Sequence, residues 1–177
     1  MCRSVALNQR VVLRVLSLLL LLASAAGGGQ RPAGLPADVT EENLKGATIT
    51  LARSECFGPC PVYQVEIHGD GTVKFKGRKY VTALGTRRYK IPVARVRELV
   101  GEFYKIDFFA LKDEYTQIVL PDGGIEVAED LPGATVTIKL GGRKKSVFDY
   151  YGTPQSVRQL EDKIDEVSGA DKFIPPE

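Results

Sequence analysis

The sequence predicts an α+β fold, in which an antiparallel sheet built from hairpins is covered on one face by two helices. Three observations support this prediction. Short segments of alternating apolar and polar residues lie between residues 47 and 91 and again between 135 and 150. Glycine-containing turns separate most of these segments. Each group of alternating segments is followed by a proline and then by apolar residues at helical spacing.

In the first half, strands are expected where β-branched and alternating residues recur. Glycine and aspartate at 69–71 supply the positive φ angles of a tight turn between two of these strands. After Pro92, the spacing of Val93, Val96, Leu99, Val100 and Phe103 predicts an amphipathic helix. The expected strands span residues 47–51, 62–67, 72–76, 79–83 and 87–91.

The second half repeats this order of elements. Strands are expected over 135–140 and 145–150, joined by a turn at Gly141 and Gly142. Thr153 is expected to cap a helix whose apolar stripe ends before Gly169. Residues 72–79 also resemble residues 137–144, so the fold could consist of two hairpin-plus-helix halves, although biased strand composition would explain the similarity as well.

The N-terminal segment predicts export. Residues 1–14 carry three arginines and no acid, residues 15–23 form an apolar run, and Ala23-Ser24-Ala25 supplies small residues for cleavage. This order is typical of a secretory signal peptide, and the run is too short for a membrane span. We therefore expect a signal peptide over 1–26, a flexible glycine- and proline-rich spacer over 27–44 and a single domain over 45–174. The predicted location is secreted or periplasmic, with no membrane span after cleavage.

Charge limits the partners that the mature protein can take. The 177-residue chain has 24 basic and 22 acidic residues, but removing the leader leaves 21 basic against 22 acidic residues. Nothing in this balance indicates nucleic-acid binding. The natural partner is unknown from sequence; an envelope or extracellular protein or an anionic polymer would be consistent with the predicted location.

Cys56 and Cys60 flank the sequence Phe-Gly-Pro, and three interpretations of the pair remain open. An oxidising compartment and a reversing loop favour a disulfide. A redox dithiol would normally be placed at a helix N-terminus or beside positive charge, whereas Cys60 leads into an expected strand. A metal site would need two further ligands, and the chain offers a single histidine, His68. We favour the disulfide and expect no metal and no cofactor.

The sequence from Cys56 to Tyr63, followed by Asp70-Gly71 and Gly77, resembles a family of exported bacterial domains of unknown function. The signature of that family is C-F-G-x-C-P-x-Y followed by a D-G hairpin. Weaker matches extend the resemblance over most of residues 48–174, including Tyr151-Gly-Thr-Pro154. The resemblance implies an exported α+β domain and implies no reaction.

Catalytic chemistry finds little support in the sequence. His68 lies at a predicted turn, and no G-x-S-x-G motif accompanies it. Glu126, Glu129 and Asp130 could act as acids or bases, but they lie in a loop-like stretch where such groups are usually solvated. We name no catalytic residue and expect a non-enzymatic module.

Basic residues on the predicted sheet provide a candidate binding surface. They could contact an anionic polymer or an envelope surface, although lysines on strands also serve simply to discourage edge pairing. The functional alternatives are therefore a binding or interaction module, a thiol–disulfide redox protein using Cys56 and Cys60, and a polyanion-binding module. The candidate basic residues are Lys74, Lys76, Arg78, Arg143 and Lys144.

Overall fold

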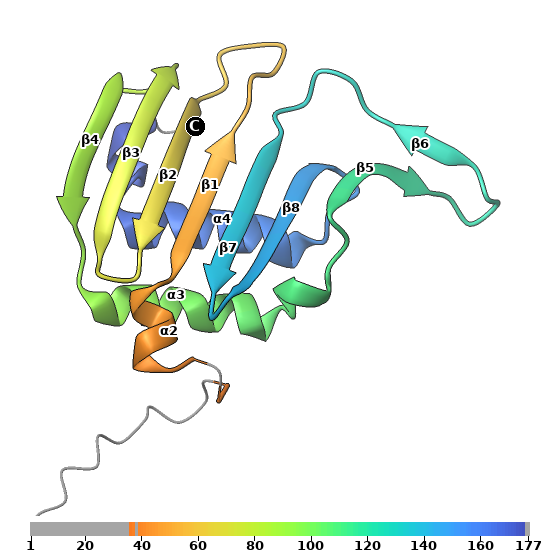
Figure 1. Cartoon of the computed structure of the whole chain (residues 1–177). Helices are drawn as coiled ribbons and strands as arrows, with labels where there is room; N and C mark the ends of the chain where they lie inside the picture. Colours follow the sequence, from red (N-terminus) through yellow and green to blue (C-terminus); the bar gives the residue numbers. More distant parts are fainter. Residues whose placement is uncertain (1–35, 38, 176–177) are drawn as a thin grey trace, which may run out of the picture. The chain divides into compact units, whose positions relative to one another are not determined.

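The computed structural model describes residues 36–37 and 39–175. Its centre is an eight-stranded sheet in the order β4-β3-β2-β1-β7-β8-β5-β6 (Figure 1). Neighbouring strands are antiparallel except for β5 and β8, which are parallel. The predicted signal peptide lies outside the described residues.

The strands follow the chain in two groups. The first group comprises β1 (Thr48–Arg53), β2 (Val62–His68), β3 (Thr72–Lys79) and β4 (Gly85–Lys90). The second comprises β5 (Glu114–Val119), β6 (Ile125–Val127), β7 (Ala134–Leu140) and β8 (Arg143–Tyr151). β1 pairs with β2 on one side and with β7 on the other, so the two groups form one continuous sheet.

Three α-helices belong to the described residues: α2 (Glu41–Lys45), α3 (Val93–Lys105) and α4 (Gln155–Ser168). α3 and α4 lie against the same face of the sheet (Figure 1). The predicted α+β fold with two helices on one face of a mainly antiparallel sheet is confirmed. Two short 3-10 helices, η1 (Phe108–Ala110) and η2 (Asp171–Phe173), follow α3 and α4.

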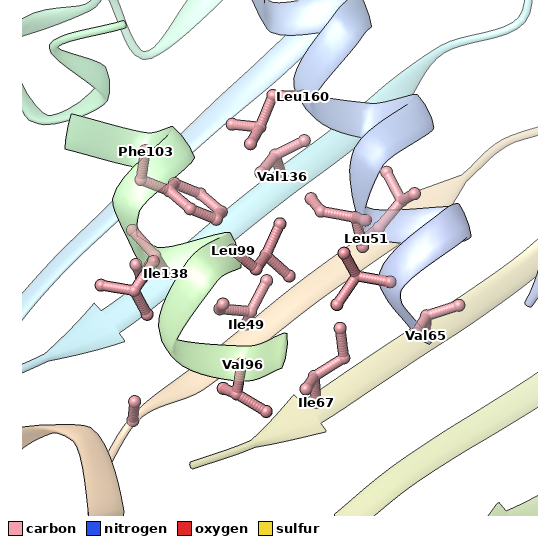
Figure 2. Packing of buried hydrophobic residues seen from close by; sticks show 14 of the residues in the cluster. Ile49, Leu51, Val65, Ile67, Val96, Leu99, Phe103, Val136, Ile138 and Leu160 are labelled. Atoms are coloured by element: carbon pink, nitrogen blue, oxygen red, sulfur yellow. The ribbon is translucent and has the colours of Figure 1, made fainter. Parts of the chain in front are cut away.

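The core lies between the sheet and these two helices (Figure 2). The inward residues of β1, β2 and β7 meet the apolar stripes of α3 and α4 because alternate strand residues point to one face. Each residue of this layer is almost entirely removed from solvent, which is the main stabilising contribution to the fold. The layer includes Ile49, Leu51, Val65, Ile67, Val136, Ile138, Val96, Leu99, Phe103 and Leu160.

α2 adds to this core from the residues before β1. Its N-cap is Thr40, whose hydroxyl accepts a hydrogen bond from the Asn43 N–H at 3.1 Å, and its Leu44 is buried. α2 occupies part of the range for which the sequence predicted a spacer. A helix therefore precedes the first strand of the sheet.

Several local predictions were wrong. The expected strand over 79–83 is absent, because β3 runs to Lys79 and Tyr80 then adopts a left-handed conformation (φ 50°). Thr153 does not cap α4; the N-cap is Pro154, and no side chain caps this helix. Val93 was expected on the buried face of α3 but is 41% exposed. By contrast, Gly169 ends α4 with a left-handed φ of 70°, as predicted.

The two similar sequences are not structurally equivalent. Residues 72–79 form the single strand β3, whereas residues 137–144 cover the end of β7, the turn and the start of β8. Each of the two groups of strands is nevertheless followed by one helix of the covering layer.

Candidate functional site

A pocket of about 600 Å³ opens where β1 ends and β2 and β7 begin, on the side of the sheet that carries α4. The last residue of β1, the first residues of β2 and one face of α4 form its polar part. The loop after Cys60, the start of β7 and the C-terminal segment form the rest. The lining includes Arg53, Cys60, Pro61, Tyr63, Leu131, Pro132, Asp149, Arg158, Glu161, Asp162, Asp165 and Ile174.

Arg53 is the centre of the polar part. It lies on the inward side of β1, two residues after Leu51, so its side chain points toward α4. Its Nη1 donates to Glu161 Oε2 at 3.0 Å and its Nη2 donates to Asp165 Oδ2 at 3.0 Å. Because α-helical residues four apart lie on one face, both carboxylates face the same guanidinium group.

Tyr63 completes the cluster from β2. The hydroxyl accepts a hydrogen bond from Arg53 Nε at 2.8 Å and donates one to Asp165 Oδ2 at 2.6 Å. All three side-chain nitrogens of Arg53 and the Tyr63 proton are therefore used inside the cluster. We call Arg53, Tyr63, Glu161 and Asp165 the charged cluster.

The acceptors of the charged cluster are not all used. Glu161 Oε1 and Asp165 Oδ1 are buried and have no hydrogen-bond partner among the described residues. Glu161 is 3% exposed and Asp165 is 7% exposed, so water cannot readily replace a partner. A side-chain hydrogen bond with Asp149 contributes to the raised pKa of Glu161, so the two carboxyl groups lie against each other in the cluster.

Burial dominates the proton affinities of the cluster. Desolvation raises the pKa of Glu161 to about 8, against the lowering effect of Arg53, and the nearby Asp149 raises it further. Desolvation also raises the pKa of Asp165, again opposed by Arg53. For Tyr63, burial and then the Asp165 carboxylate raise the pKa of the phenol well above its usual value. Glu161 is thus the group whose charge changes near neutral pH.

A second ion pair lies next to this cluster. Asp149 on β8 is buried, and its Oδ2 lies 3.4 Å from Arg158 Nε on α4. Asp162 is exposed and lies 3.9 Å from Arg53 Nη2. The pocket therefore combines four carboxyl groups with two guanidinium groups, beside the apolar side chains of Leu131, Pro132 and Ile174.

The loop between β1 and β2 forms another wall. Cys56 and Cys60 are joined by a disulfide, with their Cα atoms 5.9 Å apart. Of the three interpretations of the pair, the disulfide is the one present in the structure. Cys60 and the following Pro61 line the pocket, whereas Phe57, between the two cysteines, is 88% exposed. Neither cysteine lies at a helix N-terminus.

The five candidate basic residues are divided between two strands, with three on β3 and two at the start of β8. Lys74 and Lys76 on β3 and Lys144 on β8 alternate with inward core residues and therefore point to the face without helices. Arg78 is exposed near the end of β3. Arg143 lies on the opposite side, where its guanidinium carbon is 3.9 Å from the centre of the Phe109 ring. β2, β1 and β7 separate β3 from β8.

The other candidates from the sequence do not line the pocket. His68 ends β2, and its Nε2 lies 2.8 Å from Glu66 Oε1 on the same strand. Glu126 lies on β6, where it accepts a hydrogen bond from the Tyr151 hydroxyl. Glu129 and Asp130 are exposed in the loop before β7.

Metal clusters and membrane-spanning helices are both absent from the part of the chain that the structure describes. Within 36–37 and 39–175, no three His, Cys, Asp or Glu side chains are arranged to hold a metal ion. No helix of these residues is long and apolar enough to cross a membrane.

The charged cluster could not be read directly from the sequence. No local pattern distinguishes Arg53, and Tyr63 was named only as the last residue of the signature C-F-G-x-C-P-x-Y. A signal did exist on α4: Glu161 follows the apolar Val157 by four residues and Asp165 follows Glu161 by four, so both acids continue a row that begins on the apolar stripe. Acids on the buried side of a helix require partners, and Arg53 is the cation that faces them.

The fold and this pocket define the protein as a small α+β domain with a charged cavity at one end of its sheet. The chain belongs to the family DUF6438, a domain of unknown function, whose family model matches residues 47–168. The matched range includes the disulfide loop and the whole charged cluster. No curated protein matches the chain.

Proposed function

We propose that this protein is a non-enzymatic binding module whose pocket takes a small molecule bearing a cationic nitrogen, such as an amine. The observation that carries the proposal is the excess of carboxyl groups over guanidinium groups in the lining of the pocket. Hydrogen bonds between a cationic nitrogen and a carboxylate are stronger than those between neutral groups.

The charge of the pocket favours a cation over an anion. Arg53 is already engaged by Glu161, Asp165 and Tyr63, and Arg158 lies beside Asp149. Three of the five N–H groups of Arg53 are thus directed at the cluster, and the four carboxyl groups of the cavity outnumber its two guanidinium groups. Leu131, Pro132 and Ile174 add an apolar wall, so an amine attached to an apolar body would contact both parts.

Benzylamine and benzyl alcohol provide a matched pair of probes for this proposal. The two molecules have similar size and an identical ring, but the amine is cationic at neutral pH. We expect benzylamine to raise the melting temperature of the full chain saturably, because a ligand that binds the folded state stabilises it. Benzyl alcohol should produce a much smaller shift, and benzoate should produce none.

Asp162→Asn tests whether the pocket is responsible. This side chain is 81% exposed at the rim, so the substitution should leave the fold intact while removing one negative charge. We expect weaker benzylamine binding in this variant. The matched control is Asp171→Asn, at a position exposed outside the pocket, which should bind as the unmodified chain does. Equal shifts with amine and alcohol would contradict the proposal.

Export is part of the proposed function, and the leader-like sequence of residues 1–26 supports it. In an oxidising compartment the Cys56–Cys60 disulfide would persist and hold one wall of the pocket. The alternative role as a redox protein predicts a reduction potential near that of thioredoxin or more oxidising. Equilibration of the native protein with glutathione buffers measures this potential, and a much lower value supports a structural bond.

Polyanion binding is a second candidate. It is favoured by the position of Lys74, Lys76 and Lys144 on the face without helices. Binding to heparin at low salt, weakened in the triple Lys→Ser variant and lost at high salt, would support it. Binding that does not respond to salt or to the triple substitution would remove it.

A further inference from the structure

The sheet has two free edges, β4 and β6, as its strand order shows. β6 belongs to a hairpin with β5, and Figure 1 shows this hairpin extending beyond the helices that cover the rest of the sheet. We call residues 114–127 the arm. A free strand edge presents backbone donors and acceptors that can pair with another strand.

Large apolar side chains are exposed at both edges. On the arm, Val119, Ile125 and Val127 are 62–66% exposed, and Ile118 and Leu120 are each 36% exposed. Beside β4, Leu84 is 61% and Val93 is 41% exposed. Together the two edges hold seven of the nine large apolar residues that are exposed in the described part of the chain. Such clustering on a surface marks an interaction site.

The two edges carry opposite charges. Residues 114–130, which contain the arm, include five acidic residues and no basic residue. Residues 72–90, which form β3 and β4, include seven basic residues and no acidic residue. Each edge is therefore complementary to the other in charge, while each would repel a copy of itself.

The backbone at both edges is also oriented for pairing. Leu120 N–H donates to the Gly124 carbonyl at 2.9 Å, so the alternation of an antiparallel ladder turns the backbone groups of Ile125 and Val127 away from β5. Ile91 N–H donates to the Gly71 carbonyl at 2.9 Å, so the groups of Thr86, Arg88 and Lys90 point away from β3.

We propose that β6 of one copy pairs with β4 of a second copy, so that the sheet continues from one molecule into the next. The contact joins two different surfaces, so it is heterologous and leaves one edge of each type free. Association therefore increases with protein concentration and does not stop at a dimer. High salt weakens it because the charges at the contact are exposed.

The test uses two variants of the full chain, each with one edge blocked. Val127→Pro removes an outward N–H from β6, and Arg88→Pro removes one from β4; neither N–H takes part in the existing ladder. Sedimentation velocity should show concentration-dependent growth for the unmodified chain and a monomer for each variant alone. An equimolar mixture should form a dimer and nothing larger, because it contains one intact edge of each type.

The mixture distinguishes pairing of β6 with β4 from association through any other surface. An apolar N-terminal segment is common to all samples, so it cannot produce a species that exists only in the mixture. If Arg88→Pro alone still dimerises, the arm pairs with itself and the proposal is overturned. A monomeric unmodified chain or a monomeric mixture also overturns it. Should a proline variant fail to fold, Arg88→Glu and Glu129→Lys replace the pair: each alone should stay monomeric, and their mixture must associate, because every arm then meets a β4 edge of opposite charge.

Discussion

Arg53 is held between two carboxyl groups that are both largely removed from water. We predict that Arg53→Met destabilises the protein by about 3–5 kcal/mol, because it leaves Glu161 and Asp165 buried without their cation. Urea unfolding at neutral pH measures this loss. Arg95→Met is the matched control, since its ion pair with Glu166 is exposed to solvent and should contribute little to stability. Similar losses in both variants would contradict the role assigned to Arg53.

Glu161 should also make stability depend on pH. Its pKa is raised from 4.5 to about 8 by burial, so the folded protein binds more protons than the unfolded chain between these values. The contribution of this group is fully present below about pH 4.5 and is lost as the pH rises through about 8. Urea unfolding at successive pH values should therefore show a decline over this range in the unmodified chain.

Glu161→Gln isolates this effect, because the substitution keeps the shape and removes the titration. The decline with pH should become smaller in the variant, and the remainder should reflect Asp165, whose pKa burial also raises. An identical pH profile in both proteins would show that Glu161 does not titrate differently in the folded state.

Within β3, Gly77 leaves no space for a side chain. A Cβ atom at Gly77 would lie 2.1 Å from the Ala83 carbonyl oxygen and 2.7 Å from Val81 Cγ2. Gly77→Ala should therefore force the loop after β3 to move, at a cost of about 1–3 kcal/mol in unfolding free energy. Gly46→Ala is the control, because the nearest atom to its Cβ would be 3.8 Å away. Thermal and urea unfolding compare the two, and equal effects would contradict the close approach.

The disulfide loop is a short covalent ring between β1 and β2. Replacing both cysteines with serine should lower the unfolding free energy by roughly 2 kcal/mol, according to the loop-entropy model for so small a ring. Because Cys60 and Pro61 line the pocket, we also expect benzylamine binding to weaken in this variant. Unchanged ligand binding alongside lower stability would show that the loop supports the fold alone.

Strands and helices with strong periodicity were the elements that the sequence could predict. Inward residues such as Val65 and Phe75, and the α3 residues Leu99 and Phe103, are buried as expected. The arm was not predicted, and Glu126 was expected in a loop-like stretch, because the apolar side chains of the arm are exposed and no core alternation identifies them. The parallel pairing of β5 with β8 brings together strands that are distant in sequence, and no local pattern records it.

For the candidate site, local sequence patterns predicted the disulfide but not the charged cluster. The cysteines are four residues apart, so their pairing depends on one loop. By contrast, the hydrogen bond from Arg53 to Asp165 joins residues separated by 112 positions, and it forms only when β1 and α4 have packed on the same core. The charged cluster is therefore a property of the tertiary structure.

For the whole molecule, the central position of β1 has a consequence for biosynthesis. β1 comes from the start of the domain, yet one of its two neighbours is β7, near the end. While the ribosome is still making the intervening residues, one side of β1 has no native strand to pair with. The nascent chain consequently cannot complete its sheet until most of the polypeptide has been synthesised, which leaves a period in which chaperones meet an unfinished fold.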